Sequence, residues 1–271
     1  MPALHAFTES AYGPHLRQRY DLFVPADADQ CPTVICLPGH WWTAGDHHDL
    51  RGVALRLAEA GWAAASVGTR LLEKDLRSGE ELLGDVMQAC EKIVDEASLH
   101  GAHERGVVLL GSGSGSLTAL TAATRMLSER KCRLRVVAAI ACGLTPSTRP
   151  WEGCPLERAG AVKTFGGEHP ERLDPATLPD DAFPPVLILH GEADEAVPPK
   201  HALALQKRLA AAGEIARLET VPHAGHQWIE AVHDRPSRFA IDRSIAFLRE
   251  VAPLAPPAQG AATPGRLSAR L

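Results

Sequence analysis

The stretch that most constrains the fold of this chain is residues 107–123, where an apolar run, a glycine–serine turn and a segment of small residues follow one another. Residues 107–110 read Val-Val-Leu-Leu, which is typical of a strand buried on both faces. Residues 111–116 alternate glycine and serine and are too small and flexible to continue the strand. From Leu117 onward, alanine and leucine favour a helix. We therefore predict a strand, a sharp turn and a helix in direct succession.

A strand and a helix joined by a tight turn of small residues form the setting of a nucleophile elbow, whose usual pattern is G-x-S-x-G. The outer glycines of the pattern fall on Gly111 and Gly115, and the central position, where the pattern has serine, is Gly113. A frame shifted by one residue makes Ser114 the alternative nucleophile. That shift puts Leu117 where strand and helix need a small residue to approach closely, so Gly113 is the better match to the nucleophile position.

Strands and helices alternate along most of the chain. Apolar or alternating runs predict further strands at residues 19–25, 33–37, 62–67, 135–141, 185–189 and 216–221. Amphipathic stretches predict helices at residues 46–60, 79–98, 200–212 and 234–251. This order predicts an α/β fold with a mostly parallel central sheet and helices on both faces.

The domain organisation follows from two stretches without clear periodicity. Residues 143–183 are rich in proline, glycine and charge and are too long for a simple connection, so we expect a small cap-like insertion within one domain of residues 1–251. Proline, alanine and glycine dominate residues 252–271, which we expect to form a disordered tail.

Composition excludes several kinds of partner. The formal net charge is −5 and no basic stripe with interleaved aromatic residues occurs, so we expect no nucleic acid partner. No apolar run approaches the ~20 residues of a membrane span. The first residues lack the regions of a signal peptide, and we expect a cytoplasmic protein. The sequence does not indicate an oligomeric state.

Cysteines and histidines give no clear metal motif. None of the 6 cysteines forms a C-x-x-C pair, and Cys36, Cys90 and Cys142 stand in apolar surroundings typical of buried free thiols. The run Asp46-His47-His48-Asp49 resembles a ligand set, but Asp46 is explained as a helix N-cap, and adjacent histidines diverge on a helix. We therefore expect neither a metal ion nor another cofactor.

Four loops that follow predicted strands, at residues 38–45, 111–116, 190–198 and 222–228, resemble loops of the α/β-hydrolase fold. The likeness is to the esterase and acetyl-esterase-like branch, which has kynurenine formamidase-like relatives. Residues 38–42, Pro-Gly-His-Trp-Trp, stand where that branch has H-G-G-G-W. Residues 189–194, Leu-His-Gly-Glu-Ala-Asp, match the acid loop, and residues 224–226, Ala-Gly-His, match the histidine loop. The order of elbow, acid and histidine is that of the fold.

This resemblance implies a role for each matching residue. Asp194 is the implied triad acid and His226 the implied base, with His223 as an alternative base. Gly113 stands at the nucleophile position without a serine, so both the elbow and the oxyanion loop depart from the pattern. The implied oxyanion donors and pocket walls are His40, Trp41, Trp42 and Ser114.

The function implied by the resemblance is hydrolysis of a carboxylic ester or related acyl bond, with a small acyl ester or amide as substrate. That mechanism needs a serine at position 113 or the use of Ser114. The alternative is a non-hydrolytic relative that binds a small molecule or uses His226 alone for acid–base chemistry.

Overall fold

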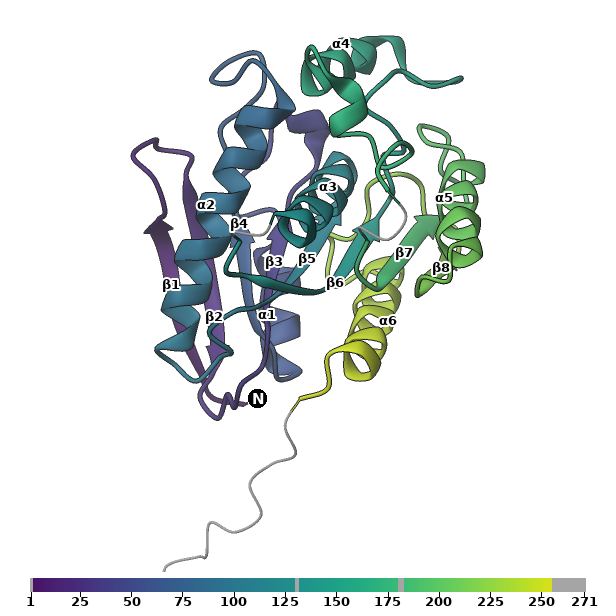
Figure 1. Cartoon of the computed structure of the whole chain (residues 1–271). Coiled ribbons are helices and arrows are strands. Elements are labelled where there is room, and N and C mark those ends of the chain that lie inside the picture. The colour runs from purple at the N-terminus through teal and green to yellow at the C-terminus, as the bar shows by residue number, and fades with distance from the viewer. Residues whose placement is uncertain (1, 130–131, 180–182, 255–271) are drawn as a thin grey trace, which may run out of the picture.

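The computed structural model describes residues 2–129, 132–179 and 183–254, and within these ranges the strands form one 8-stranded sheet in the order β1-β2-β4-β3-β5-β6-β7-β8 (Figure 1). The strands are β1 (Leu4–Ala11), β2 (Arg19–Pro25), β3 (Thr33–Leu37), β4 (Ala63–Val67), β5 (Gly106–Ser112), β6 (Arg135–Cys142), β7 (Val186–Gly191) and β8 (Ala216–Val221). The pairs β1–β2 and β2–β4 are antiparallel, and all other pairs are parallel. The predicted mostly parallel sheet is confirmed.

Helices cover both faces of this sheet. They are α1 (Arg51–Glu59), α2 (Gly79–Ser98), α3 (Ser114–Ser128), α4 (Leu156–Gly166), α5 (Lys200–Ala211) and α6 (Arg235–Val251), with short 3₁₀ turns η1 (His40–Trp42) and η2 (Pro170–Arg172). Helices α2 and α3 contact each other in front of the sheet in Figure 1, while α1 and α6 contact each other on the opposite face. Helix α5 packs on β7 and β8.

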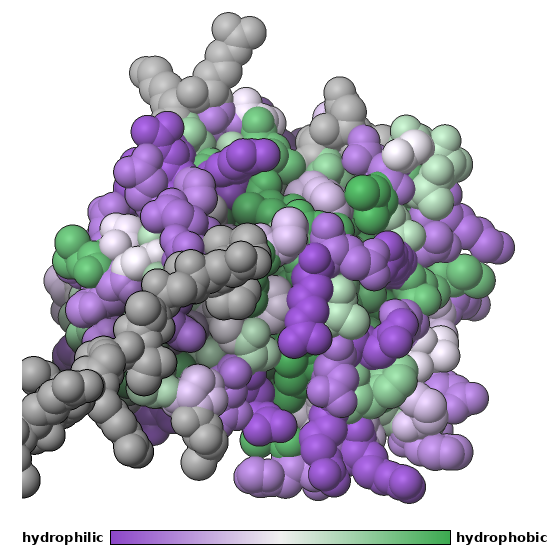
Figure 2. Space-filling view, turned by 90° about the horizontal axis from the view of Figure 1, so that it is seen from below, coloured by the Kyte–Doolittle hydropathy of each residue, from purple (hydrophilic) through white to green (hydrophobic). Residues whose placement is uncertain are grey.

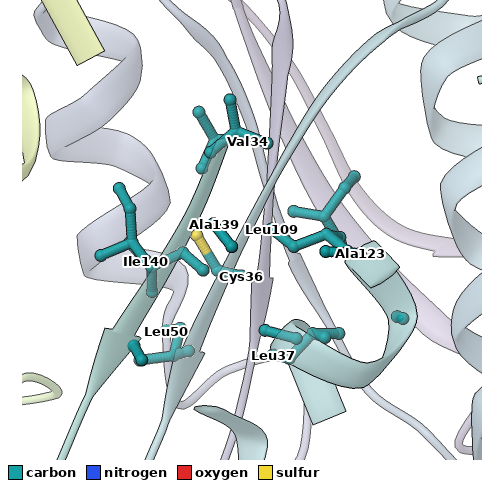
Figure 3. Packing of buried hydrophobic residues seen from close by; sticks show 14 of the residues in the cluster. Val34, Cys36, Leu37, Leu50, Leu109, Ala123, Ala139 and Ile140 are labelled. Atoms are coloured by element: carbon teal, nitrogen blue, oxygen red, sulfur yellow. The ribbon is translucent and has the colours of Figure 1, made fainter. Parts of the chain in front are cut away.

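The core lies between these layers and explains why the central strands have no polar alternation. Every residue of β3, β4 and β5 is buried, since each strand has a helix layer on both sides. Successive side chains point to opposite faces, so Cys36 packs to one side of the sheet and Leu37 to the other (Figure 3). The predicted burial of the free thiols Cys36, Cys90 and Cys142 is confirmed, and desolvation raises the pKa of each.

One strand and the starts of two helices differ from the sequence prediction. The antiparallel strand β1 was not expected, because an edge strand with many exposed residues lacks an apolar run. The helix predicted at residues 46–60 begins only at Arg51 as α1, and Asp46 accepts a hydrogen bond from the His48 N–H at 2.8 Å instead of capping a helix. The elbow helix begins at Ser114 rather than at Leu117.

The insertion at residues 143–183 contains α4 and η2 and lies at the upper edge of the molecule in Figure 1, where α4 contacts α2 and η1. Its description as a cap within one domain stays a prediction. The disordered tail at residues 252–271 also stays a prediction, although at its start Ala252 is buried and Leu254 packs against the core. The rest of that predicted tail, residues 255–271, lies outside the described residues.

The lower end of the molecule in Figure 1 lies opposite the insertion with α4. Figure 2 shows hydrophilic side chains over much of that face, with hydrophobic ones between them. Among the described residues, no helix is both long enough and apolar enough to cross a membrane.

Candidate active site

The turn between β5 and α3 has the close packing that its small residues predict. A Cβ atom on Gly111 would lie 2.1 Å from the carbonyl oxygen of Gly115, and one on Gly115 would lie 2.3 Å from the carbonyl oxygen of Leu37. Both positions therefore require glycine. Gly113 lies at the apex, with φ 51° and ψ −122°, a conformation that side chains adopt only under strain.

Gly113 differs from its two neighbours in having room for a side chain. A Cβ atom built on it would meet His226 Nε2 at 3.5 Å and the Gly39 Cα at 3.9 Å, both ordinary contact distances. A hydroxyl attached to that Cβ would fall within hydrogen-bond reach of the imidazole. The apex of the turn therefore faces the histidine, with space for a small nucleophile between them.

Asp194 and His226 are brought together from the loops that follow β7 and β8. Asp194 Oδ2 lies 2.9 Å from His226 Nδ1. The other carboxylate oxygen, Oδ1, accepts a hydrogen bond of 2.8 Å from the Val197 N–H. The Asp194 side chain is fully buried, whereas that of His226 keeps 12% of its surface exposed. The pair thus has a fixed acid and an imidazole whose Nε2 faces the apex of the elbow.

The environment of Asp194 favours its ionised form. Burial alone would raise the pKa of its carboxyl group, but hydrogen bonding to His190 and His226 outweighs desolvation and lowers the pKa below its ordinary value. His190 is completely buried; its Nε2 lies 2.8 Å from the Val197 carbonyl oxygen and 3.3 Å from Asp194 Oδ2. An ionised Asp194 accepts a hydrogen bond from His226 Nδ1 and so holds the His226 ring in one orientation.

The loop after β3 reaches the same site in an unusual backbone conformation. His40, Trp41 and Trp42 have φ angles of 53°, 55° and 61°, so three successive non-glycine residues are left-handed. Gly39, before them, passes so close to the elbow that a Cβ there would lie 2.6 Å from the Ser112 carbonyl oxygen. The loop therefore keeps a backbone shape suited to glycine while carrying three large side chains.

The two tryptophans of this loop have different partners. The Trp41 ring stacks on His226, with centroids 5.5 Å apart, and on Trp151 of the insertion, with centroids 6.1 Å apart. Trp42 points away from His226, stacks on Phe165 and donates a hydrogen bond of 2.8 Å to Thr118 Oγ1. Trp41 is thus the tryptophan that contacts the histidine, and Trp42 anchors the loop to α3 and α4.

His40 is turned toward the surface side of the loop. Its Nε2 lies 3.4 Å from Asp49 Oδ2, and hydrogen bonding to this carboxylate raises the pKa of the imidazole. Gln227 Nε2 lies 3.3 Å from His40 Nδ1, so His40 contacts the residue next to His226 rather than His226 itself.

The other serines of the elbow have surroundings unlike those of Gly113. The Ser114 hydroxyl is buried and has no hydrogen-bond partner in the described part of the chain, which includes His226. The Ser112 hydroxyl donates a hydrogen bond of 2.6 Å to Glu230. The exposed His223 makes no bond to Asp194 among those described; its N–H contacts Glu192.

Sequence reasoning missed Glu230 and Trp151. Glu230 lies four residues beyond His226 and is joined to the elbow only by a contact across 118 residues of sequence. Trp151 lies in the insertion, which has no clear periodicity, so no sequence pattern predicts that it contacts Trp41. Neither residue had a local signal, because both reach the site only through the three-dimensional fold.

The chain has an α/β-hydrolase fold. Two antiparallel pairs, β1–β2 and β2–β4, are followed by a parallel sheet, with an elbow after β5, an aspartate after β7 and a histidine after β8. The chain belongs to the prolyl oligopeptidase family, whose model matches residues 74–253, more than half of its length. The matched region includes Gly113, Asp194 and His226 but not the loop at residues 38–42. No curated protein matches the chain.

Solved structures with the same fold include several esterases. Esterase B from Lactobacillus rhamnosis, in an inhibited form, is 18% identical with a TM-score of 0.79, and the alignment covers 92% of this chain and 87% of that one. Esterase 2 from Thermogutta terrifontis, phosphonylated by sarin, is 19% identical with a TM-score of 0.73, covering 94% and 98%. A truncated carbohydrate esterase from gut microbiota is 18% identical with a TM-score of 0.73, covering 92% and 96%. At these identities the likeness establishes the fold.

Proposed function

We propose that the chain carries the acyl-binding site of a carboxylic ester hydrolase from which the nucleophilic side chain is missing at Gly113. The observation that carries the proposal is that a Cβ added at Gly113 would meet His226 Nε2 at 3.5 Å, an ordinary contact distance that leaves room for a small side chain beside the imidazole. The substrate class is a small acyl ester or amide. Similar solved structures with esterase names support the choice of an acyl bond.

In this proposal His226 is the general base and Asp194 orients it and stabilises its charged form. The backbone N–H of Ser114, at the start of α3, and those of His40 and Trp41 are the proposed oxyanion donors. With glycine at position 113, the only nucleophile that His226 can activate is water. We therefore expect very weak acyl hydrolysis by the chain as it stands, since a triad enzyme without its nucleophile loses about 10⁶ in kcat.

A second candidate is a non-hydrolytic relative that binds a small molecule or performs acid–base chemistry with His226. The stacking of Trp41 on His226 favours it, because this ring occupies space beside the imidazole that a glycine loop would leave to an acyl group. The kynurenine formamidase-like branch and a cytoplasmic location also stay predictions.

Hydrolysis of short-chain p-nitrophenyl esters by the chain and by Gly113→Ser tests the two candidates. The substitution supplies a hydroxyl next to His226, and its backbone strain of about 1–3 kcal/mol is of a size that elbows normally support. Gly113→Ala is the matched control, because it adds the same Cβ and the same strain without a hydroxyl. Mass spectrometry after treatment with a phosphonate ester reports whether residue 113 becomes covalently modified.

We expect Gly113→Ser to gain esterase activity and to form the phosphonyl adduct, and Gly113→Ala to do neither. A folded Gly113→Ser that is inert and unmodified would contradict the acyl-transfer proposal and favour the non-hydrolytic candidate. Full activity of the unmodified chain, abolished by Ser114→Ala, would instead identify Ser114 as the nucleophile.

A further inference from the structure

A cluster of one carboxylate and two imidazoles, Glu9, His47 and His48, lies where the loop that carries His40 leads into α1. Glu9 belongs to β1, whose pairing with β2 shifts register between Phe7 and Ser10. Glu9 lies within this irregularity with φ 58°, and its N–H donates a hydrogen bond of 2.9 Å to Asp21 Oδ1. The bulge directs the Glu9 carboxylate toward His47 and His48, which precede α1.

The three side chains present their ligand atoms to one another. His47 Nε2 lies 3.1 Å from Glu9 Oε2, and His48 Nε2 lies 2.8 Å from Glu9 Oε1. One such atom from each residue falls within 4.8 Å of the other two. The expectation that these histidines diverge was wrong in its premise, since residues 46–49 lie before the helix and the two rings are 4.1 Å apart.

His47 gives an independent indication that something is missing from this cluster. The residue is only 6% exposed, and among the described residues its Nε2 makes no hydrogen bond of good geometry, although Glu9 Oε2 lies 3.1 Å away. A buried imidazole nitrogen whose polar neighbour is poorly aligned recovers only part of the hydration that it has lost. A ligand atom of His47 lies within 4.8 Å of one from each of the other two residues, a distance at which all three can share one cation.

His48 has a second carboxylate on the side of its ring away from Glu9. Its Nδ1 lies 2.8 Å from Asp46 Oδ1, so an Nδ1–H donated to this carboxylate would leave the Nε2 lone pair, on the Glu9 side, to bind a cation. A carboxylate behind a ligating histidine is the usual outer partner in metal sites, where it fixes the tautomer and raises the basicity of the imidazole.

We propose that Glu9, His47 and His48 bind a zinc ion, with Asp46 as the outer partner of His48. Two imidazole nitrogens and one carboxylate oxygen suit Zn²⁺, and a fourth, solvent ligand completes a tetrahedral site. Calcium and magnesium are disfavoured because they prefer oxygen ligands alone. The cluster joins β1 to the 46–49 turn, so the ion would tie the edge strand to the loop of the candidate active site.

The rival account is a metal-free ion cluster. Arg51 Nη2 lies 3.3 Å from Glu9 Oε1 and offers this carboxylate a positive charge without a metal. Arg51 has a closer partner, however, since its Nε lies 2.5 Å from the fully buried carboxylate of Asp21. The Arg51 guanidinium can therefore keep its ion pair with Asp21 while one or both carboxylate oxygens of Glu9 coordinate a zinc ion.

Isothermal titration of the metal-stripped full chain with Zn²⁺ near neutral pH tests the proposal, with Co²⁺ absorption as a report of ligand geometry. We expect one equivalent of zinc to bind and to raise the melting temperature. Glu9→Gln and His48→Ala, at exposed positions that tolerate change, should remove this binding. Asp46→Asn should weaken it by about 10–100-fold, the usual effect of losing an outer partner.

His233→Ala is the matched control, because His233 is exposed and lies outside the cluster. It should bind zinc as the unmodified chain does. Failure of the unmodified chain to bind a stoichiometric zinc ion would overturn the proposal and leave the ion cluster with Arg51. Unchanged binding in both Glu9→Gln and His48→Ala would also overturn it, since the ion would then occupy other residues.

Discussion

The two sides of the candidate active site differ in how closely they keep the pattern of the fold. On the side of β7 and β8, Asp194 Oδ2 lies 2.9 Å from His226 Nδ1. Both carboxylate oxygens of Asp194 have a hydrogen-bond partner. On the side of β3 and β5, a glycine, Gly113, stands at the apex of the elbow, and three large residues at positions 40–42 have left-handed φ angles. Gly113, Asp194 and His226 lie within the family match, whereas residues 38–42 precede it.

This difference separates two kinds of constraint. A buried carboxylate or imidazole that lacks one of its hydrogen-bond partners lowers the stability of the fold. Substitution of either Asp194 or His226 alone is therefore costly. The nucleophile side depends on backbone shape, which glycines at positions 111 and 115 maintain through packing whether or not residue 113 carries a hydroxyl. A residue 113 without a hydroxyl is thus compatible with the observed shape of the elbow.

The largest effect on kcat is expected when Asp194 is substituted in a chain that already carries serine at position 113. In a Gly113→Ser background, Asp194→Asn should lower kcat by about 10⁴, because the amide no longer orients and stabilises the imidazole in the required tautomer. Stopped-flow ester hydrolysis measures the change, and circular dichroism controls for folding. A loss of less than tenfold would show that His226 works without Asp194 and that the two sides are not a triad.

A smaller effect is expected from the aromatic side. Trp41→Ala should lower the free energy of unfolding by about 3–5 kcal/mol, the usual cost for a buried tryptophan, because Trp41 is 7% exposed and stacks on two rings. Chemical denaturation gives the value.

Trp41→Gly separates packing from backbone strain. It should be less destabilising than Trp41→Ala by about 1–2 kcal/mol, the cost of a left-handed non-glycine residue. Equal losses for the two variants would mean that the loop changes conformation when the ring is removed.

The third test uses pH. Since the pKa of Asp194 is lowered in the fold, its charge stabilises the protein fully above the unfolded pKa of about 3.9, and this contribution is lost as the pH falls through the lower folded value. The difference in unfolding free energy between the chain and Asp194→Asn should therefore shrink on acidification below about pH 4. Urea denaturation at a series of pH values measures it, and a constant difference would contradict an ionised Asp194.

The smallest effect is expected at Ser114. Because its buried hydroxyl has no partner, Ser114→Ala should change the unfolding free energy by no more than about 1 kcal/mol. In the Gly113→Ser background it should leave esterase activity unchanged, since alanine keeps the backbone N–H. An activity loss of tenfold or more would identify Ser114, and not residue 113, as the nucleophile. The elbow would then already carry its serine, and the two sides of the site would not differ in this respect.

The sequence predicted the central sheet well because buried parallel strands carry continuous apolar runs, as in residues 107–110. It also indicated Asp194, His226 and the elbow, since each lies in a loop directly after a strand. It failed at β1, where few apolar side chains are buried, and at residues 46–50, where a turn held by Asp46 replaces the first helical turn.

The rest of the site depends on contacts that no local pattern encodes. Trp151 reaches Trp41 from the insertion, and Glu230 reaches Ser112 from the histidine loop. Glu9 meets His47 and His48 only because an irregularity in an edge strand turns its side chain toward them. Each contact joins segments whose relative placement is fixed by the assembled sheet.

The open apex of the elbow also has a consequence at the level of the gene. Some glycine codons become serine codons by change of a single base, and the backbone at Gly113 already has the shape that a nucleophile would need. No insertion, loop rebuilding or second substitution has to come first. Where position 113 has such a codon, one point mutation places a serine hydroxyl beside His226, and selection can act on that variant directly.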